Sequence, residues 1–66
     1  MENLKIKFIK KYANLPWGAR EEIIAVVDDQ NFTWNSANIE IDRGMNPPTE
    51  IGEKILKQLQ ELGILV

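Results

Sequence analysis

The residue types that most often carry enzymatic chemistry are scarce in this 66-residue chain, which contains no histidine and no cysteine. Hydrolytic and acid–base enzymes commonly use these residues, or tuned carboxylates, as base or nucleophile. Ser36 is the single serine, and there is no histidine to activate it. The four glycines are scattered and match no phosphate-binding fingerprint. We therefore predict that the protein is not an enzyme.

Carboxylates are the remaining candidates for chemistry, and their spacing does not favour it. Glu21 and Glu22 are adjacent, and adjacent residues of a helix point about 100° apart, so they do not form an acid–base pair. Asp28-Asp29 could join Glu40 and Asp42 around a hard cation, but the spacing matches no calcium loop. Structural zinc sites rely on cysteine and histidine. We predict no metal and no cofactor, and interpret Asp28-Asp29 as a solvated acidic turn.

The charges of the chain are segregated along the sequence. The net charge is −2, but residues 1–20 sum to +4 and residues 21–66 sum to −6. Nucleic-acid binders usually carry a basic balance or a basic stripe, and here any such stripe is confined to the N-terminal segment. If the chain binds nucleic acid, its phosphate contacts must come from Lys5, Lys7, Lys10, Lys11, Arg43, Lys54 and Lys57.

Several apolar residues are surplus to a small core and are candidates for contact with a partner. Ile6 lies off the apolar stripe of the first predicted helix, and Trp17 lies in a turn between Pro16 and Gly18. An exposed tryptophan is a common anchor of binding surfaces. Residues 64–66 are all apolar. The candidate partner contacts are therefore Ile6, Trp17, Ile64, Leu65 and Val66.

Helical periodicity and proline punctuation divide the first half of the chain. An apolar repeat with lysines on its other side predicts a helix over residues 3–14, and Pro16 interrupts it. A second helix is expected to start at Pro16 or Trp17 and to continue to Val27. The run Ile-Ile-Ala-Val-Val within it is dense and β-branched, so a strand is the alternative there.

The second half contains one ambiguous segment and one clear helix. Residues 32–34 are expected to be a short extended piece, and residues 35–42 fit either a helix capped by Thr33 or a strand. Residues 43–48 contain Gly and Pro-Pro and predict a loop. Thr49 predicts the N-cap of a helix that Gly63 terminates, and residues 64–66 are expected to form an edge strand.

These elements predict a mainly α fold with three to four helices and a minimal two-stranded sheet, in a single domain over residues 1–66. Residues 1–15 would be the N-terminal helix and residues 16–66 the core. The predicted core residues are Phe8, Ile24, Val27, Trp34, Ile51, Ile55, Leu59 and Leu62.

The C-terminal residues 55–65, with leucines at helical spacing followed by Glu-Leu-Gly-Ile-Leu, resemble the end of the recognition helix of winged-helix and helix-turn-helix domains. The resemblance covers roughly residues 18–66 and implies a winged-helix-like core with a regulatory role. The loop over residues 43–49 is longer than a helix-turn-helix turn, and a second wing strand is missing. The chain is also similar to small uncharacterised archaeal proteins with a Phe/Tyr-Thr-Trp-Asn segment, which implies no activity.

Two functions follow from these features. The first is a non-catalytic protein-interaction or adaptor module, with a protein partner, a second copy of the chain, or both. The alternative is a DNA-binding transcriptional regulator of the winged-helix type, whose acidic balance predicts weak binding. The N-terminal residues lack the apolar run of a signal peptide and no stretch is long enough to span a bilayer, so a cytoplasmic location is expected.

Overall fold

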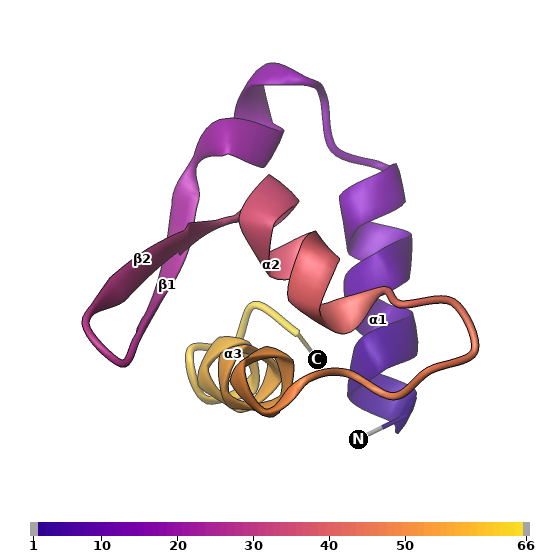
Figure 1. Cartoon of the computed structure of the whole chain (residues 1–66). Helices are drawn as coiled ribbons and strands as arrows, with labels where there is room; N and C mark the ends of the chain where they lie inside the picture. Colours follow the sequence, from indigo (N-terminus) through magenta and orange to yellow (C-terminus); the bar gives the residue numbers. More distant parts are fainter. Residues whose placement is uncertain (1, 66) are drawn as a thin grey trace.

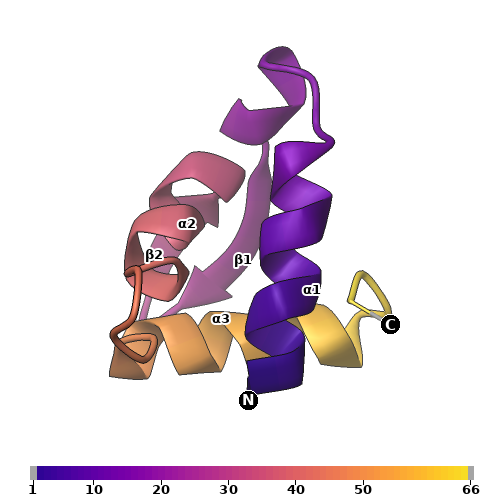
Figure 2. The same ribbon diagram turned by 90° about the vertical axis from the view of Figure 1, so that its right-hand side faces the viewer.

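The computed structural model describes residues 2–65, with side chains from Leu4 onward. Over these residues the chain is a small α+β fold, in which three α-helices surround the buried face of an antiparallel hairpin (Figure 1). Helix α1 (Glu2–Ala13) is followed by a short 3₁₀ helix, η1 (Gly18–Glu21), and then by strands β1 (Ile23–Val27) and β2 (Gln30–Thr33). Helices α2 (Trp34–Ile41) and α3 (Glu50–Glu61) complete the order. Seen from the side, α3 runs below α2 and the hairpin and passes behind the N-terminal end of α1 (Figure 2).

The predicted second helix is wrong over most of its length, because the β-branched run of residues 23–27 forms β1. A two-residue turn, Asp28-Asp29, joins β1 to β2, with Val27 opposite Gln30. Both aspartates have positive φ, as the common type I′ hairpin turn requires. Ile24 is an extra residue between the pairs Ile23–Thr33 and Ala25–Phe32, and such a bulge increases the local twist. Only Gly18–Glu21 of the predicted helix is helical.

The helical alternative is confirmed for the ambiguous segment of residues 35–42. Thr33 caps α2 by accepting a hydrogen bond from the Ser36 backbone N–H at 3.1 Å. In return, the Ser36 hydroxyl oxygen accepts from the Thr33 backbone N–H at 2.8 Å. Two otherwise unpaired donors are thereby satisfied, so α2 starts directly where β2 ends.

Both ends of α3 agree with the prediction. The Thr49 hydroxyl accepts a hydrogen bond from the Gly52 N–H at 3.0 Å at the start of the helix. At its end, Gly63 has a φ of 78°, the Ile64 N–H bonds to the Leu59 carbonyl, and the Gly63 N–H bonds to the Gln60 carbonyl. This is the Schellman motif. It turns the tail back toward the core, so residues 64 and 65 form no strand, and Val66 lies outside the described residues.

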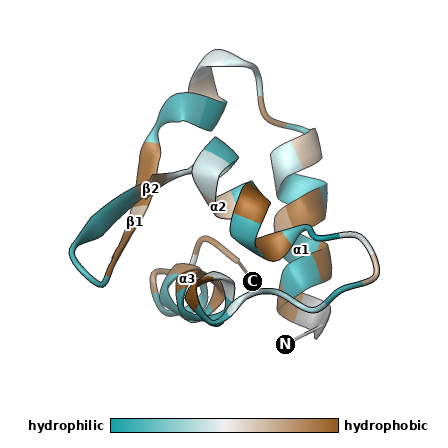
Figure 3. Cartoon of the chain, in the orientation of Figure 1, coloured by the Kyte–Doolittle hydropathy of each residue, from teal (hydrophilic) through white to brown (hydrophobic). Residues whose placement is uncertain are grey.

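The core lies where α1, α2, α3 and the inner face of the hairpin meet, and Figure 3 shows apolar segments on the facing sides of these elements. Most of the predicted core is confirmed: Phe8, Val27, Trp34, Ile55 and Leu59 are buried, and Ile24 and Ile51 pack partly buried against them. The prediction that Leu62 belongs to the core is wrong, because 63% of its surface is exposed. Leu65 is buried in its place, with 3% exposed.

Helices α2 and α3 meet at a backbone-to-backbone contact. The Thr49 N–H donates to the Glu40 carbonyl at 2.9 Å, and the Thr49 hydroxyl lies 2.9 Å from the Glu40 carboxylate oxygen Oε1. Gly52 lies against the same peptide: a Cβ there would lie 2.9 Å from the carbonyl carbon of Glu40. Only glycine allows this approach, so residue 52 sets the position of the start of α3 against the end of α2.

Candidate functional site

The structure places all the predicted phosphate-contacting cations except Lys57 in two groups, and the first group stabilises the fold itself. The Lys5 ammonium donates to the carbonyls of Gly44 and Asn46, each at 3.1 Å, and so ties the loop between α2 and α3 to α1. Lys54 on α3 lies 3.3 Å from the carboxylate of Asp28 in the hairpin turn.

Arg43 belongs to the same group, because its guanidinium donates to the Pro47 carbonyl at 3.1 Å within the loop between α2 and α3. Lys57 is exposed on α3 and is not among the residues that line the groove beside the lysines of α1. Arg43, Lys54 and Lys57 therefore do not join the N-terminal lysines in one basic surface.

The second group consists of three exposed lysines of α1 that gather beside the C-terminal tail. A groove of about 310 Å³ lies between α1 and the tail. We call it the lysine groove, and its lining residues are Lys7, Lys10, Lys11, Asn14, Ile64 and Leu65. No described residue forms an ion pair or a side-chain hydrogen bond with these three ammonium groups. The groove thus combines positive charge with an apolar wall.

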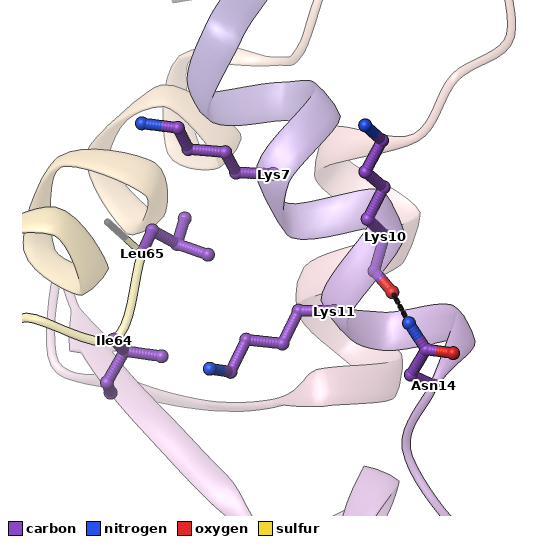
Figure 4. Close-up of a pocket in the computed structure, with 6 residues that line it drawn as sticks. All are labelled: Lys7, Lys10, Lys11, Asn14, Ile64 and Leu65. Carbon is purple, nitrogen blue, oxygen red and sulfur yellow. Dashed lines mark hydrogen bonds between the residues drawn. The ribbon is translucent and has the colours of Figure 1, made fainter.

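The side chains of the lysine groove are not equivalent. In Figure 4, Lys7 and Lys11 extend from α1 toward the tail, with Leu65 near Lys7 and Ile64 near Lys11. The Lys10 ammonium points away from the tail, and the Asn14 amide donates to the Lys10 backbone carbonyl at 3.0 Å. Lys7 and Lys11 therefore flank the apolar pair, while Lys10 widens the positive charge along α1.

The five predicted partner contacts have different positions. Ile6 is half exposed on α1, and Trp17 is 81% exposed in the linker before η1. Ile64 lines the lysine groove and is partly buried. Leu65 also borders the groove, but it is a core residue with 3% of its surface exposed, so little of its side chain is free to contact a partner. Val66 lies outside the described residues.

Trp17 belongs to a cluster that the sequence did not predict. The guanidinium carbon of Arg20 lies 4.4 Å from the ring centre of Tyr12 and 5.4 Å from that of Trp17. The Tyr12 hydroxyl donates to the Asn35 side chain at 2.6 Å. An arginine between two aromatic rings is favourable through cation–π attraction. The cluster holds the linker of residues 14–17 against α1 and leaves Trp17 accessible.

The acidic residues considered as cation ligands are dispersed. Asp28 pairs with Lys54, and the Glu40 carboxylate accepts from Thr49. Within the part of the chain that the structure describes, no three acidic side chains come together in an arrangement that could hold a metal ion. No helix of residues 2–65 is long and apolar enough to cross a membrane.

Of the two sides of the lysine groove, only the lysines of α1 could be predicted from the sequence. The spacing of Lys7, Lys10 and Lys11 places them on one side of α1, which periodicity indicates. The apolar wall comes from a tail some fifty residues later, and nothing near those lysines indicates its position. Comparison of the chain with protein-family models, with curated proteins and with solved structures found no match.

Proposed function

We propose that the protein is a non-catalytic interaction module that docks an acidic protein partner in the lysine groove. The observation that carries the proposal is the separation of the cations. Lys5, Arg43 and Lys54 are engaged within the fold, whereas the ammonium groups of Lys7, Lys10 and Lys11 gather on α1 without a partner among the described residues. Such a cluster attracts carboxylates and speeds encounter with an acidic partner.

The shape and size of the basic surface favour a protein partner over duplex DNA. Lys7 and Lys11 are one helical turn apart, which is about 6 Å along the axis. A DNA-binding protein can contact about 6–10 phosphates along the duplex. Three lysines provide too few contacts, and the nine acids of residues 21–66 repel a polyanion. An apolar wall also has little use against a phosphate backbone, whereas it suits a side chain of a protein.

A winged-helix relationship remains part of the proposal, with α2 and α3 as the pair that would correspond to a helix-turn-helix. Its support is the C-terminal resemblance of α3 and the close packing of α2 on α3 at Gly52. Helix α3 carries Glu50, Glu53 and Glu61 against Lys54 and Lys57, so it has no excess of positive charge. This lack of positive charge favours a winged-helix-like module used for protein contact rather than for reading DNA.

The proposal is tested by titrating the isotope-labelled full chain with a poly-glutamate peptide and following backbone amide resonances. We expect shifts confined to α1 and residues 64–65, weakening steeply as salt is added because exposed ion pairs are screened. The triple variant Lys7→Gln, Lys10→Gln, Lys11→Gln should lose them. The matched control Lys57→Gln removes one exposed lysine of α3 and should retain them.

A parallel titration with a mixed-sequence DNA duplex separates the two functions. We expect weak, salt-sensitive binding, with a log–log slope of roughly −2.7 if about three phosphates are neutralised. Tight binding to the duplex that persists at moderate salt, together with no response to poly-glutamate, would contradict the proposal and favour the DNA-binding regulator. A homodimer stays a prediction, and its contact would have to use exposed residues such as Ile6 or Trp17 rather than Leu65.

A further inference from the structure

The arrangement of charge around the apolar wall restricts the kind of acidic segment that fits the lysine groove. Lys7 and Lys11 are separated by one helical turn and lie on either side of the pair Ile64 and Leu65 (Figure 4). A ligand that satisfies this arrangement must present two negative groups that reach Lys7 and Lys11 and an apolar group beside them that reaches Ile64. A uniformly acidic chain satisfies only the first of these requirements.

We propose, building on the proposed function, that the occupant is an acidic amphipathic helix of a partner protein. On a helix, residues i and i+4 are neighbours with the same axial spacing as Lys7 and Lys11. A residue at i+3 is a neighbour of residue i and lies about 60° around the helix from it, so its side chain projects beside the acidic pair. The matching pattern is therefore acid-x-x-apolar-acid, with the carboxylates on Lys7 and Lys11 and the apolar side chain against Ile64. Apolar helices docked in grooves use this i, i+3, i+4 face.

An extended strand fits this geometry less well. Alternate residues of a strand are also separated by roughly 6.5–7 Å, so two acids at i and i+2 could reach both lysines. The residue between them, however, points to the opposite face and away from Ile64. At about 310 Å³ the groove is at the small end of ligand pockets, which suits one apolar side chain and its two acidic neighbours.

Three helical peptides in an alanine–glutamine background test the proposal. The first carries Glu-Ala-Ala-Leu-Glu, the second has alanine in place of the leucine, and the third has the composition of the first with the two glutamates adjacent. Each is titrated against the full chain by amide resonance shifts at low salt. We expect the first peptide to bind roughly tenfold more tightly than the other two, because only it places an apolar side chain beside two carboxylates that are one helical turn apart.

Protein variants locate the contact. The double variant Lys7→Gln, Lys11→Gln should bind the first peptide roughly tenfold more weakly, as expected for the loss of two partly exposed ion pairs. Lys57→Gln should leave its affinity unchanged. Ile64→Ala should reduce the advantage of the first peptide over the second, with circular dichroism confirming that the variant is folded.

The outcomes separate this proposal from the one on which it rests. If poly-glutamate binds but the three peptides bind alike or not at all, the helical occupant is wrong and the acidic docking surface stands. If no acidic peptide of any kind binds, both proposals fail. Groove resonances that respond to anionic vesicles or duplex DNA at lower concentration than to the first peptide would overturn the helical partner. If the groove resonances shift when the protein alone is concentrated, the occupant of the groove is a second copy of this chain and the helical partner is wrong.

Discussion

Gly52 has a role at the residue scale that no substitution preserves. Its Cα faces the Glu40 peptide, so a Cβ would lie 2.9 Å from the Glu40 carbonyl carbon and 3.2 Å from the Pro48 Cβ. We expect Gly52→Ala to lower the free energy of unfolding by about 1–3 kcal/mol, because backbone must move to accept the methyl group. Urea denaturation followed by circular dichroism measures the change.

Gly18 provides the matched control for that substitution. Nothing lies within 4 Å of a Cβ built there, and its φ is not in the left-handed region. Gly18→Ala should therefore leave the stability unchanged or raise it by up to about 1 kcal/mol, since alanine lowers the entropy of the unfolded chain. An equal loss of unfolding free energy in both variants would show that the backbone at Gly52 does not pack closely against the Glu40 peptide.

Asp29 is a second position where the backbone conformation decides the outcome. Its φ of 65° lies in the left-handed region, which costs most residues about 1–2 kcal/mol and glycine nothing. We expect Asp29→Gly to raise the free energy of unfolding by about 0.5–1 kcal/mol and Asp29→Ala to lower it, measured by thermal and urea unfolding. Both variants remove the same charge, so their difference reports the turn alone. A loss in both would point to a role of the carboxylate.

At the scale of elements, α3 takes the place of a third strand along the outer edge of β1. The Gln58 amide accepts from the Val26 N–H at 2.9 Å and donates to the Val26 carbonyl at 3.0 Å, as a neighbouring strand would. Lys54, one turn earlier, pairs with Asp28. A two-stranded hairpin alone is marginally stable in water, so these contacts and the apolar core together keep it in place.

The Gln58 bridge predicts a pH-dependent effect of Gln58→Glu. The carboxylate can accept from Val26 N–H but cannot donate to its carbonyl, so we expect a loss of about 1 kcal/mol at neutral pH. The loss should shrink near about pH 3, where the protonated carboxyl donates again. Gln60→Glu, on the exposed side of the same helix, is the control at each pH. A loss that is identical for both variants at every pH would contradict the bridge.

At the scale of the whole molecule, stability depends on a small core, so each buried residue contributes a large share of it. Domains of this size rarely gain more than about 3–5 kcal/mol from their core. Leu59 is fully buried where the elements meet, and Leu59→Ala should cost about 2–5 kcal/mol, leaving much of the protein unfolded.

Leu62, on the same helix, provides the matched control for Leu59. It is 63% exposed, so Leu62→Ala should change the free energy of unfolding by less than about 0.5 kcal/mol. The two variants are compared by their urea midpoints. A large loss on truncating Leu62 would restore the sequence-based prediction that it is a core residue.

Charge is also arranged at the scale of the whole molecule. The excess of positive charge lies in residues 1–20 and the excess of negative charge in residues 21–66, and folding does not neutralise the lysines of α1 with described acids. Lys54–Asp28 is the one ion pair among the described side chains. The lysine groove is therefore a local positive surface on a protein of net negative charge, which favours acidic partners over long polyanions.

Local signals determined much of this protein from the sequence by itself. Helices α1 and α3, the Thr49 and Thr33 caps, the loop of residues 43–48 and the left-handed Gly63 all follow from residues within a few positions of one another. Capping and periodicity are local interactions, so a sequence window contains their cause. The lysines of α1 were identified in the same way.

Tertiary structure decided the rest, because it depended on partners far away in the chain. Residues 23–27 carry both a helical pattern and β-branched side chains, and pairing with β2 and with Gln58 selected the strand. Leu62 and Leu65 are equally apolar, but the Schellman turn at Gly63 directs Leu65 into the core and leaves Leu62 at the surface. That same turn brings Ile64 beside α1 and forms the lysine groove. No local pattern around Lys7 or Lys11 contains that contact.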